Sequence, residues 1–108
     1  MPGYRNTVTG TIAGNNESVT LPYRHHTNGG VGVQITGTFS GTLQFELTID
    51  EANYVAVTTN NVTSNSNGVS TTAPGVFKFD VVGVISVRVR STAWTSGTAT
   101  VTIAGLAG

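Results

Sequence analysis

The stretch VGVQITGTFSGTLQFELTI, residues 31–49, decides the fold class of this 108-residue chain. Its apolar side chains stand at alternate positions in two runs, Val31, Val33, Ile35 and Phe39, then Leu43, Phe45, Leu47 and Ile49. A period of two residues puts alternate side chains on opposite faces of a β-strand. The Ser40-Gly41 pair between the runs favours a turn. We therefore predict two strands here, each with one buried face.

The rest of the chain repeats this pattern. Its 15 valines and 19 threonines favour strands over helices, and no segment shows the apolar period of a helix. The further predicted strands cover residues 7–13, 18–23, 54–59, 77–81, 85–90 and 98–103. Segments that favour turns separate them, including Asn67-Gly68, Pro74-Gly75 and Ser96-Gly97.

Short strands at a spacing of about ten residues, without a long crossover helix, are typical of antiparallel sandwiches. We predict an all-β fold, a two-sheet antiparallel β-sandwich of about eight strands with a jelly-roll-like topology. An immunoglobulin-like sandwich is the alternative, because strand spacing does not determine strand order. Residues 7–108 form the single predicted domain, and residues 1–6 are predicted to be an N-terminal arm that orders on a neighbouring molecule.

The composition excludes several classes of function. Five basic and five acidic side chains give no net charge, so we expect no binding to nucleic acid or to an anionic membrane. No apolar run approaches the roughly 20 residues that span a bilayer, and no signal peptide is expected from the first residues. The chain has no cysteine, which excludes disulfides and thiol chemistry.

Few residues offer catalytic or metal-binding chemistry. His25 and His26 are adjacent, so on an extended chain they point to opposite faces and do not share one ion. Asp50, Glu51 and Asn53 could supply oxygen ligands for calcium, but the same residues favour an ordinary turn. We find no nucleophile motif and no phosphate-binding glycine loop. We therefore expect no enzyme, no cofactor and no metal site.

The polar segment of residues 60–73, NNVTSNSNGVSTTA, has two interpretations. It is either a long exposed loop with a short strand near Val69, or a contact loop at one end of the sandwich, where binding residues often gather.

Arg88 and Arg90 share one face of a predicted strand. Glu46 and Asp80 lie on polar strand faces as well, so each can pair across the sheet with Lys78 or with one of the two arginines. The arginines either form a solvated face or contact a partner, because arginine is enriched at protein interfaces.

Trp94 lies in a polar segment between two predicted strands. It can cover the end of the core, anchor a partner, or stack against a sugar together with Tyr4, Tyr23 or Tyr54.

Three runs carry a family resemblance. The first is residues 31–46, with the Gly-Thr turn and Phe-Glu strand, continuing through an Asp-led turn to residues 54–57. The others are residues 75–90, with the VRVR strand, and residues 96–103, which begin with a Ser-Gly-Thr turn. They resemble small β-sandwich modules of tailed-bacteriophage structural proteins. Glu51 stands where such modules usually carry glycine after a turn aspartate.

The resemblance implies a virion protein, in the first place a capsid decoration (cement) protein on the outer capsid surface. Its implied partners are the major capsid protein and further copies of itself, for example as a trimer. The alternative is a tail or fibre module that binds host surface glycans, and an unrelated adhesion or structural sandwich is also open. Our candidate interface residues are Tyr4, Arg5, Arg88, Arg90 and Trp94.

Overall fold

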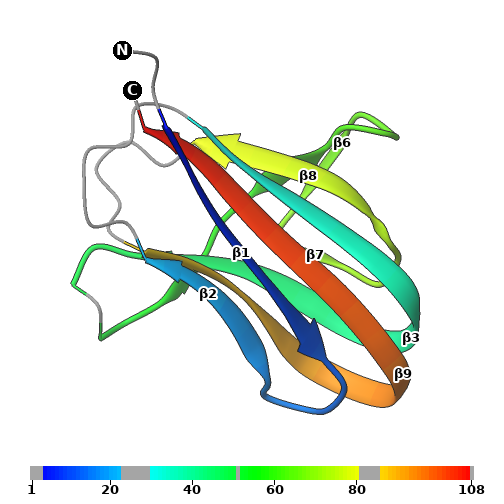
Figure 1. Ribbon diagram of the computed structural model, residues 1–108. Helices are drawn as coiled ribbons and strands as arrows, with labels where there is room; N and C mark the ends of the chain where they lie inside the picture. Colours follow the sequence, from blue (N-terminus) through cyan, green and yellow to red (C-terminus); the bar gives the residue numbers. More distant parts are fainter. Residues whose placement is uncertain (1–3, 23–29, 51, 81–85, 108) are drawn as a thin grey trace.

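The computed structural model describes residues 4–22, 30–50, 52–80 and 86–107, which form strands and turns (Figure 1). The strands are β1 (Tyr4–Ile12), β2 (Ser18–Pro22), β3 (Gly30–Thr48), β4 (Val55–Ala56), β5 (Thr59–Asn61), β6 (Ser66–Gly68), β7 (Ser70–Thr71), β8 (Gly75–Asp80) and β9 (Ser86–Ala107). Within these residues there is no helix long and apolar enough to cross a membrane. The predicted all-β antiparallel sandwich is confirmed.

Two long strands, β3 and β9, build both layers of the sandwich (Figure 1). They pair antiparallel along nearly their whole length, from Val31 opposite Gly105 to Thr48 opposite Ser86. In the first layer, β1 joins the last part of β9 and β8 joins the first part of β3, with β5 and β6 beyond. In the second layer, β2 joins the first part of β9, and β4 and β7 join the last part of β3.

The long strands bend where we predicted turns. Gly37 and Gly97 have φ of 108° and 88°, a backbone region that suits glycine, and the register shifts at Ser40/Gly41 and at Thr42/Leu43. A side chain at Gly97 would collide with the carbonyl of Thr38 on the facing strand. The predicted turns at Ser40-Gly41 and Ser96-Gly97 are therefore wrong: these residues form bulges and bends within paired strands, because bulges bend a strand without ending it.

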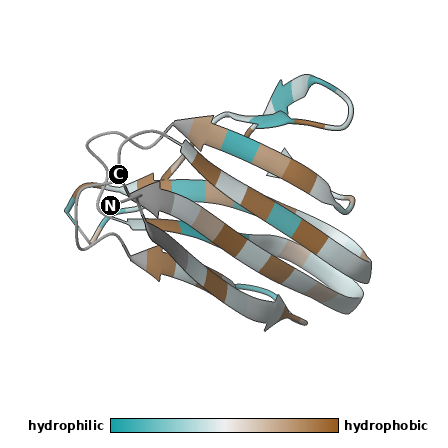
Figure 2. Cartoon of the chain, turned by 45° about the horizontal axis from the view of Figure 1, so that its top comes forward, coloured by the Kyte–Doolittle hydropathy of each residue, from teal (hydrophilic) through white to brown (hydrophobic). Residues whose placement is uncertain are grey.

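The core lies between the two layers. Figure 2 shows apolar and polar residues alternating along the strands, and the inward set from both layers is buried. Phe45 from the second layer lies with its ring centroid 4.8 Å from that of Phe77 on β8 in the first layer. The buried residues of the two central strands are Val31, Val33, Ile35, Leu43 and Phe45 on β3 and Val87, Val89, Ala99, Val101 and Ile103 on β9. The predicted inward faces of these strands are confirmed except at Ile49, which follows the end of β3 and is 71% exposed.

Two shorter segments match the prediction only in part. The strand expected over residues 54–59 is reduced to β4, where Val55 is exposed instead of sharing a buried face. Two short strands, β6 and β7, flank Val69, whose carbonyl accepts the backbone N–H of Phe45 (2.9 Å). At the other end, β1 begins at Tyr4, so residues 4–6 of the predicted arm are paired with β9.

Candidate functional site

The outer face of the second layer carries a charged cluster. Strand pairing places Glu46 opposite Arg88 and Gln44 opposite Arg90, and alternation turns all four side chains away from the core. Of the pairings predicted for Glu46, those with Arg88 and Arg90 are confirmed. Lys78 is opposite Gly32 in the first layer, so its predicted pairing with Glu46 is wrong.

Glu46 is almost completely covered although it lies on an outer face, with 2% of its surface exposed. Its carboxylate accepts the Nε of Arg88 (2.5 Å), Nη2 of Arg90 (2.9 Å) and Nε2 of Gln44 (2.7 Å). Burial by itself would raise the pKa of Glu46, but these hydrogen bonds and the charge of Arg88 outweigh burial and hold that pKa below its ordinary value. The hydrogen-bond partners of Glu46 therefore favour its ionised form.

The two arginines have further partners within the chain. The Arg88 guanidinium lies 3.9 Å from the ring centroid of Tyr54, whose hydroxyl donates to Ser86 Oγ (3.0 Å). Arg90 Nη1 donates to Asn16 Oδ1 (3.0 Å), and its ion pair with Glu46 raises the pKa of Arg90. Each arginine side chain keeps 27% of its surface exposed. They are thus held in place at the surface, and their contact with a partner stays a prediction.

Trp94 packs on its own chain at the bend. Its ring stacks on Phe39, with centroids 5.3 Å apart and planes 7° apart, and lies against Gly41, where there is no room for a side chain. The indole N–H donates to the carbonyl of Gly97 (3.2 Å). This half-buried position beside the core matches the interpretation in which Trp94 covers the end of the core.

The acidic turn is internally satisfied. The Asp50 carboxylate accepts the backbone N–H groups of Asn53 (2.8 Å) and Ala52 (2.9 Å), the Asn53 side-chain amide (3.0 Å) and the Thr48 hydroxyl (2.9 Å). These hydrogen bonds, led by the one from the Asn53 backbone, hold the pKa of Asp50 far below its ordinary value. The turn interpretation therefore accounts for Asp50.

Several sequence candidates fall outside what the structure describes. His25, His26 and Glu51 lie outside the described residues, and of Tyr4 and Arg5 only the backbone pairing with Ala107 and Leu106 is described. Within the described ranges, no group of three or more His, Cys, Asp or Glu side chains is placed to hold a metal ion.

The outer face of the first layer is rich in threonine along β1, β9 and β3, and its β8 edge carries the exposed Lys78. We call it the threonine face; it comprises Thr7, Thr9, Thr11, Gln34, Thr36, Thr100 and Thr102. Strand register aligns these residues in rows, for instance Thr11, Thr100 and Thr36. The hydroxyls of Thr9 and Thr102 are 3.2 Å apart. The threonine face ends at β1. Among the described strands, β1 pairs with β9 alone, so its other edge has no strand beside it.

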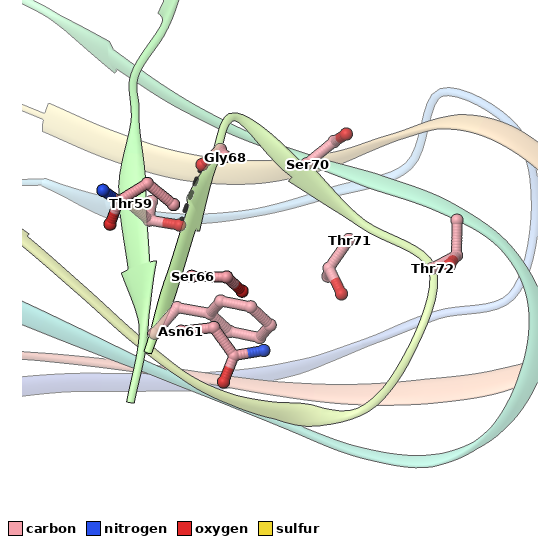
Figure 3. A pocket seen from close by; sticks show the side chains of 9 residues that line it. Thr59, Asn61, Ser66, Gly68, Ser70, Thr71 and Thr72 are labelled. Carbon is pink, nitrogen blue, oxygen red and sulfur yellow. Dashed lines mark hydrogen bonds between the residues drawn. The ribbon is translucent and has the colours of Figure 1, made fainter. Parts of the chain in front are cut away.

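A cavity of about 280 Å³ lies beside the segment whose role the sequence left open (Figure 3). Its lining consists of Thr59, Asn61, Ser66, Asn67, Gly68, Ser70, Thr71, Thr72 and Phe77. No charged side chain belongs to this lining.

Comparison with solved structures shows which proteins have a similar fold. The prophage-derived protein YomS of SPBc2 aligns with a TM-score of 0.73 and 20% identity over 96% of each chain. The exported protein XepA of PBSX aligns with a TM-score of 0.76 and 18% identity, over 95% of this chain but 38% of XepA. No protein-family model and no curated protein matches the chain in sequence. At these identities the likeness establishes the fold, and it agrees with the resemblance to phage modules seen in the sequence.

Sequence reasoning missed one positioning residue. Ser91 is fully buried at the bend of β9, where its hydroxyl donates to the carbonyl of Gly14 and accepts the backbone N–H of Glu17 (3.1 Å). Its own N–H donates to the Glu17 carbonyl (2.9 Å). Ser91 thus ties the β1–β2 connection to the bend. The one signal available was that Ser91 continues the inward parity of Val87 and Val89.

Proposed function

We propose that this chain is a non-enzymatic structural protein of a phage particle, and that it acts as a capsid decoration protein bound to the major capsid protein. The observation that carries the proposal is the fold shared with prophage-derived YomS over nearly the whole of both chains. The charged side chains of the site support a non-enzymatic role, because Glu46 and Asp50 are held ionised by partners within the chain.

The threonine face is the proposed contact surface. A neutral face of short hydroxyl side chains can lie flat on another protein without the cost of burying charge. It adjoins β1, whose free edge can extend the sheet with a strand from the capsid or from another copy of this chain. Arg5 is the one charged residue of β1, which has no Lys, Glu or Pro, so its edge carries little protection against pairing with a partner strand.

Co-sedimentation with empty, expanded capsids of the parent phage tests this proposal. We expect the protein to bind at micromolar concentration, and Thr11→Glu/Thr36→Glu to abolish binding because it places two charges in the contact. Thr58→Glu/Thr92→Glu is the matched control, since both threonines are exposed away from the threonine face. Absence of binding by the unmodified protein, or full binding by the first variant, refutes the decoration role.

A tail or fibre module that binds host glycans is the second candidate. The cavity lined by hydroxyl and amide groups favours it. Trp94 supports it less, because Phe39 stacks on the indole ring and Gly97 accepts its N–H. Glycan-array binding that survives Trp94→Ala would support this candidate through the cavity and not through the tryptophan.

A further inference from the structure

The cavity forms where the chain crosses between the two layers. β5 pairs with β8 in the first layer, at Asn60 opposite Lys78, and β7 pairs with β3 in the second layer, at Thr71 opposite Leu43. Between them, β6 and Val69 connect the layers at an open side of the sandwich. Figure 3 shows side chains from this crossing gathered around one space.

Hydrogen bonds within the crossing hold the cavity walls in shape. The buried Thr59 hydroxyl donates to the carbonyl of Gly68 (3.1 Å), which joins β5 to β6. Asn61 Oδ1 accepts the backbone N–H groups of Thr63 (3.0 Å) and Ser64 (3.3 Å) and so closes the turn between the two strands. A wall that is already ordered loses little entropy when a ligand binds.

Other polar groups of the lining have no partner within the described part of the chain. They are the Nδ2 groups of Asn61 and Asn67 and the hydroxyls of Ser70 and Thr72. The amide groups can donate, and the hydroxyls can both donate and accept. Phe77 forms the base of the lining, but it is only 3% exposed and its ring packs on Phe45 in the core.

We propose that this cavity binds one residue of a neutral sugar. Amide and hydroxyl groups match the hydroxyls of a sugar, with which they can exchange hydrogen bonds in both directions. A lining without charge favours a neutral ligand over an anionic one, because nothing in it offsets the cost of desolvating a charge. The volume of about 280 Å³ is at the lower end of the range for small-molecule sites, which limits the buried part to a single residue.

This inference goes beyond the decoration role and does not depend on it. A decoration protein with a sugar site would bind both capsid and glycan through different surfaces, since the cavity and the threonine face share no residue. Capsid binding and sugar binding therefore succeed or fail separately.

Saturation-transfer NMR on the full chain tests the site, followed by titration calorimetry. The probes are the methyl glycosides of glucose, galactose and N-acetylglucosamine, with N-acetylneuraminic acid as the anionic comparison. We expect at least one neutral glycoside to bind with a Kd on the order of a millimolar, as befits a ligand of this size. No signal from any neutral glycoside, or tighter binding of the acidic sugar, overturns the proposal.

Variants then locate the site. Ser70→Ala/Thr72→Val removes two free hydroxyls with little change of shape, and we expect it to weaken binding about tenfold, as for the loss of about 1.4 kcal/mol. Thr11→Val, on the threonine face, is the matched control and should bind as the unmodified chain does. Unchanged binding by the double variant, or equal loss in the control, shows that the sugar binds elsewhere and overturns the assignment.

Discussion

The two halves of the β3–β9 pair have the same inner face and opposite outer faces. In both halves, alternate residues of the two strands fill one core. Outside, the first half carries the threonine face, with Thr36 and Thr100 side by side and no charge. The second half carries Glu46, Arg88 and Arg90, which satisfy one another.

Because of this difference, we expect the charged outer face to contribute to stability and the threonine face to contact a partner. The charged cluster makes its hydrogen bonds within the chain, so it helps to hold the second layer together. The threonine face leaves most of its hydroxyls to solvent, so it offers a surface that can be covered at low cost. The inner faces are equivalent, and substitutions there should affect both halves at once.

The largest expected effect is that of Phe45→Ala. Phe45 is fully buried and its ring contacts Phe77 of the opposite layer, so the variant leaves a cavity between the halves. We expect a loss of about 3–5 kcal/mol in the free energy of unfolding, measured by urea denaturation. Val76→Ala, at an exposed position of β8, is the control. A loss below about 1 kcal/mol for Phe45→Ala would contradict a core shared by both halves.

Gly97→Ala tests the bend that lets one strand serve both layers. Gly97 has a φ of 88°, and an added Cβ would meet the Thr38 carbonyl and Phe39 Cα (2.6 Å). We expect a loss of about 2–3 kcal/mol by thermal or urea unfolding.

Gly32→Ala is its control on the straight part of β3. A Cβ at Gly32 meets nothing within 4 Å, so we expect a stability change of at most about 1 kcal/mol, in the stabilising direction. Equal losses for both variants would show that the bend does not depend on glycine.

Glu46→Gln tests the charged half by itself. The substitution keeps the shape but leaves Arg88 and Arg90 without a counter-ion, so we expect a loss of about 1–2 kcal/mol at neutral pH, moderated by the partial exposure of the arginines. Thr36→Gln, on the other half, should change stability by no more than about 0.5 kcal/mol.

The comparison of Glu46→Gln with the unmodified chain also predicts that the stability contributed by Glu46 depends on pH. The folded state holds the pKa of Glu46 below its ordinary 4.5, so the folded state binds fewer protons than the unfolded state in the acid range. The contribution of Glu46 is therefore complete above about pH 4.5 and is lost as the pH falls through the lower folded pKa. Urea unfolding between neutral pH and pH 3 should show the gap between Glu46→Gln and the unmodified chain narrowing with acid; a constant gap contradicts this.

The smallest expected effect is that of Thr102→Val in the threonine face. The variant removes one hydroxyl that lies 3.2 Å from that of Thr9, at a half-exposed position. We expect unfolding free energy to change by less than about 0.5 kcal/mol. A loss approaching that of Glu46→Gln, by the same urea measurement, would mean that both outer faces serve stability and would remove the contrast between the halves.

The sequence predicted the inner faces well because burial imposes a period of two on every strand. Val31, Phe45 and Val101 all lie where their parity placed them. The pairing of Glu46 with the arginines was also predictable, since all three occupy outward positions of adjacent runs.

The sequence did not predict that β3 and β9 each continue through a bend as one strand. Ser40-Gly41 and Ser96-Gly97 have the composition of turns, and the same residues can bend a paired strand instead. Only the partner strand decides between the two, and that partner is distant in the sequence. The cavity was hidden for the same reason: its lining residues come together only because β7 pairs with β3 and not with β6.

The shared strands also affect when this protein can fold. Neither layer is complete until β9 pairs with β3 across the intervening residues. Such non-local pairing is slow, in the range of milliseconds to seconds for sandwich domains. During synthesis, the first eight strands would leave the ribosome without the strand that completes both layers. The edge of β3 that pairs with β9 is therefore expected to stay exposed until β9 has been synthesised.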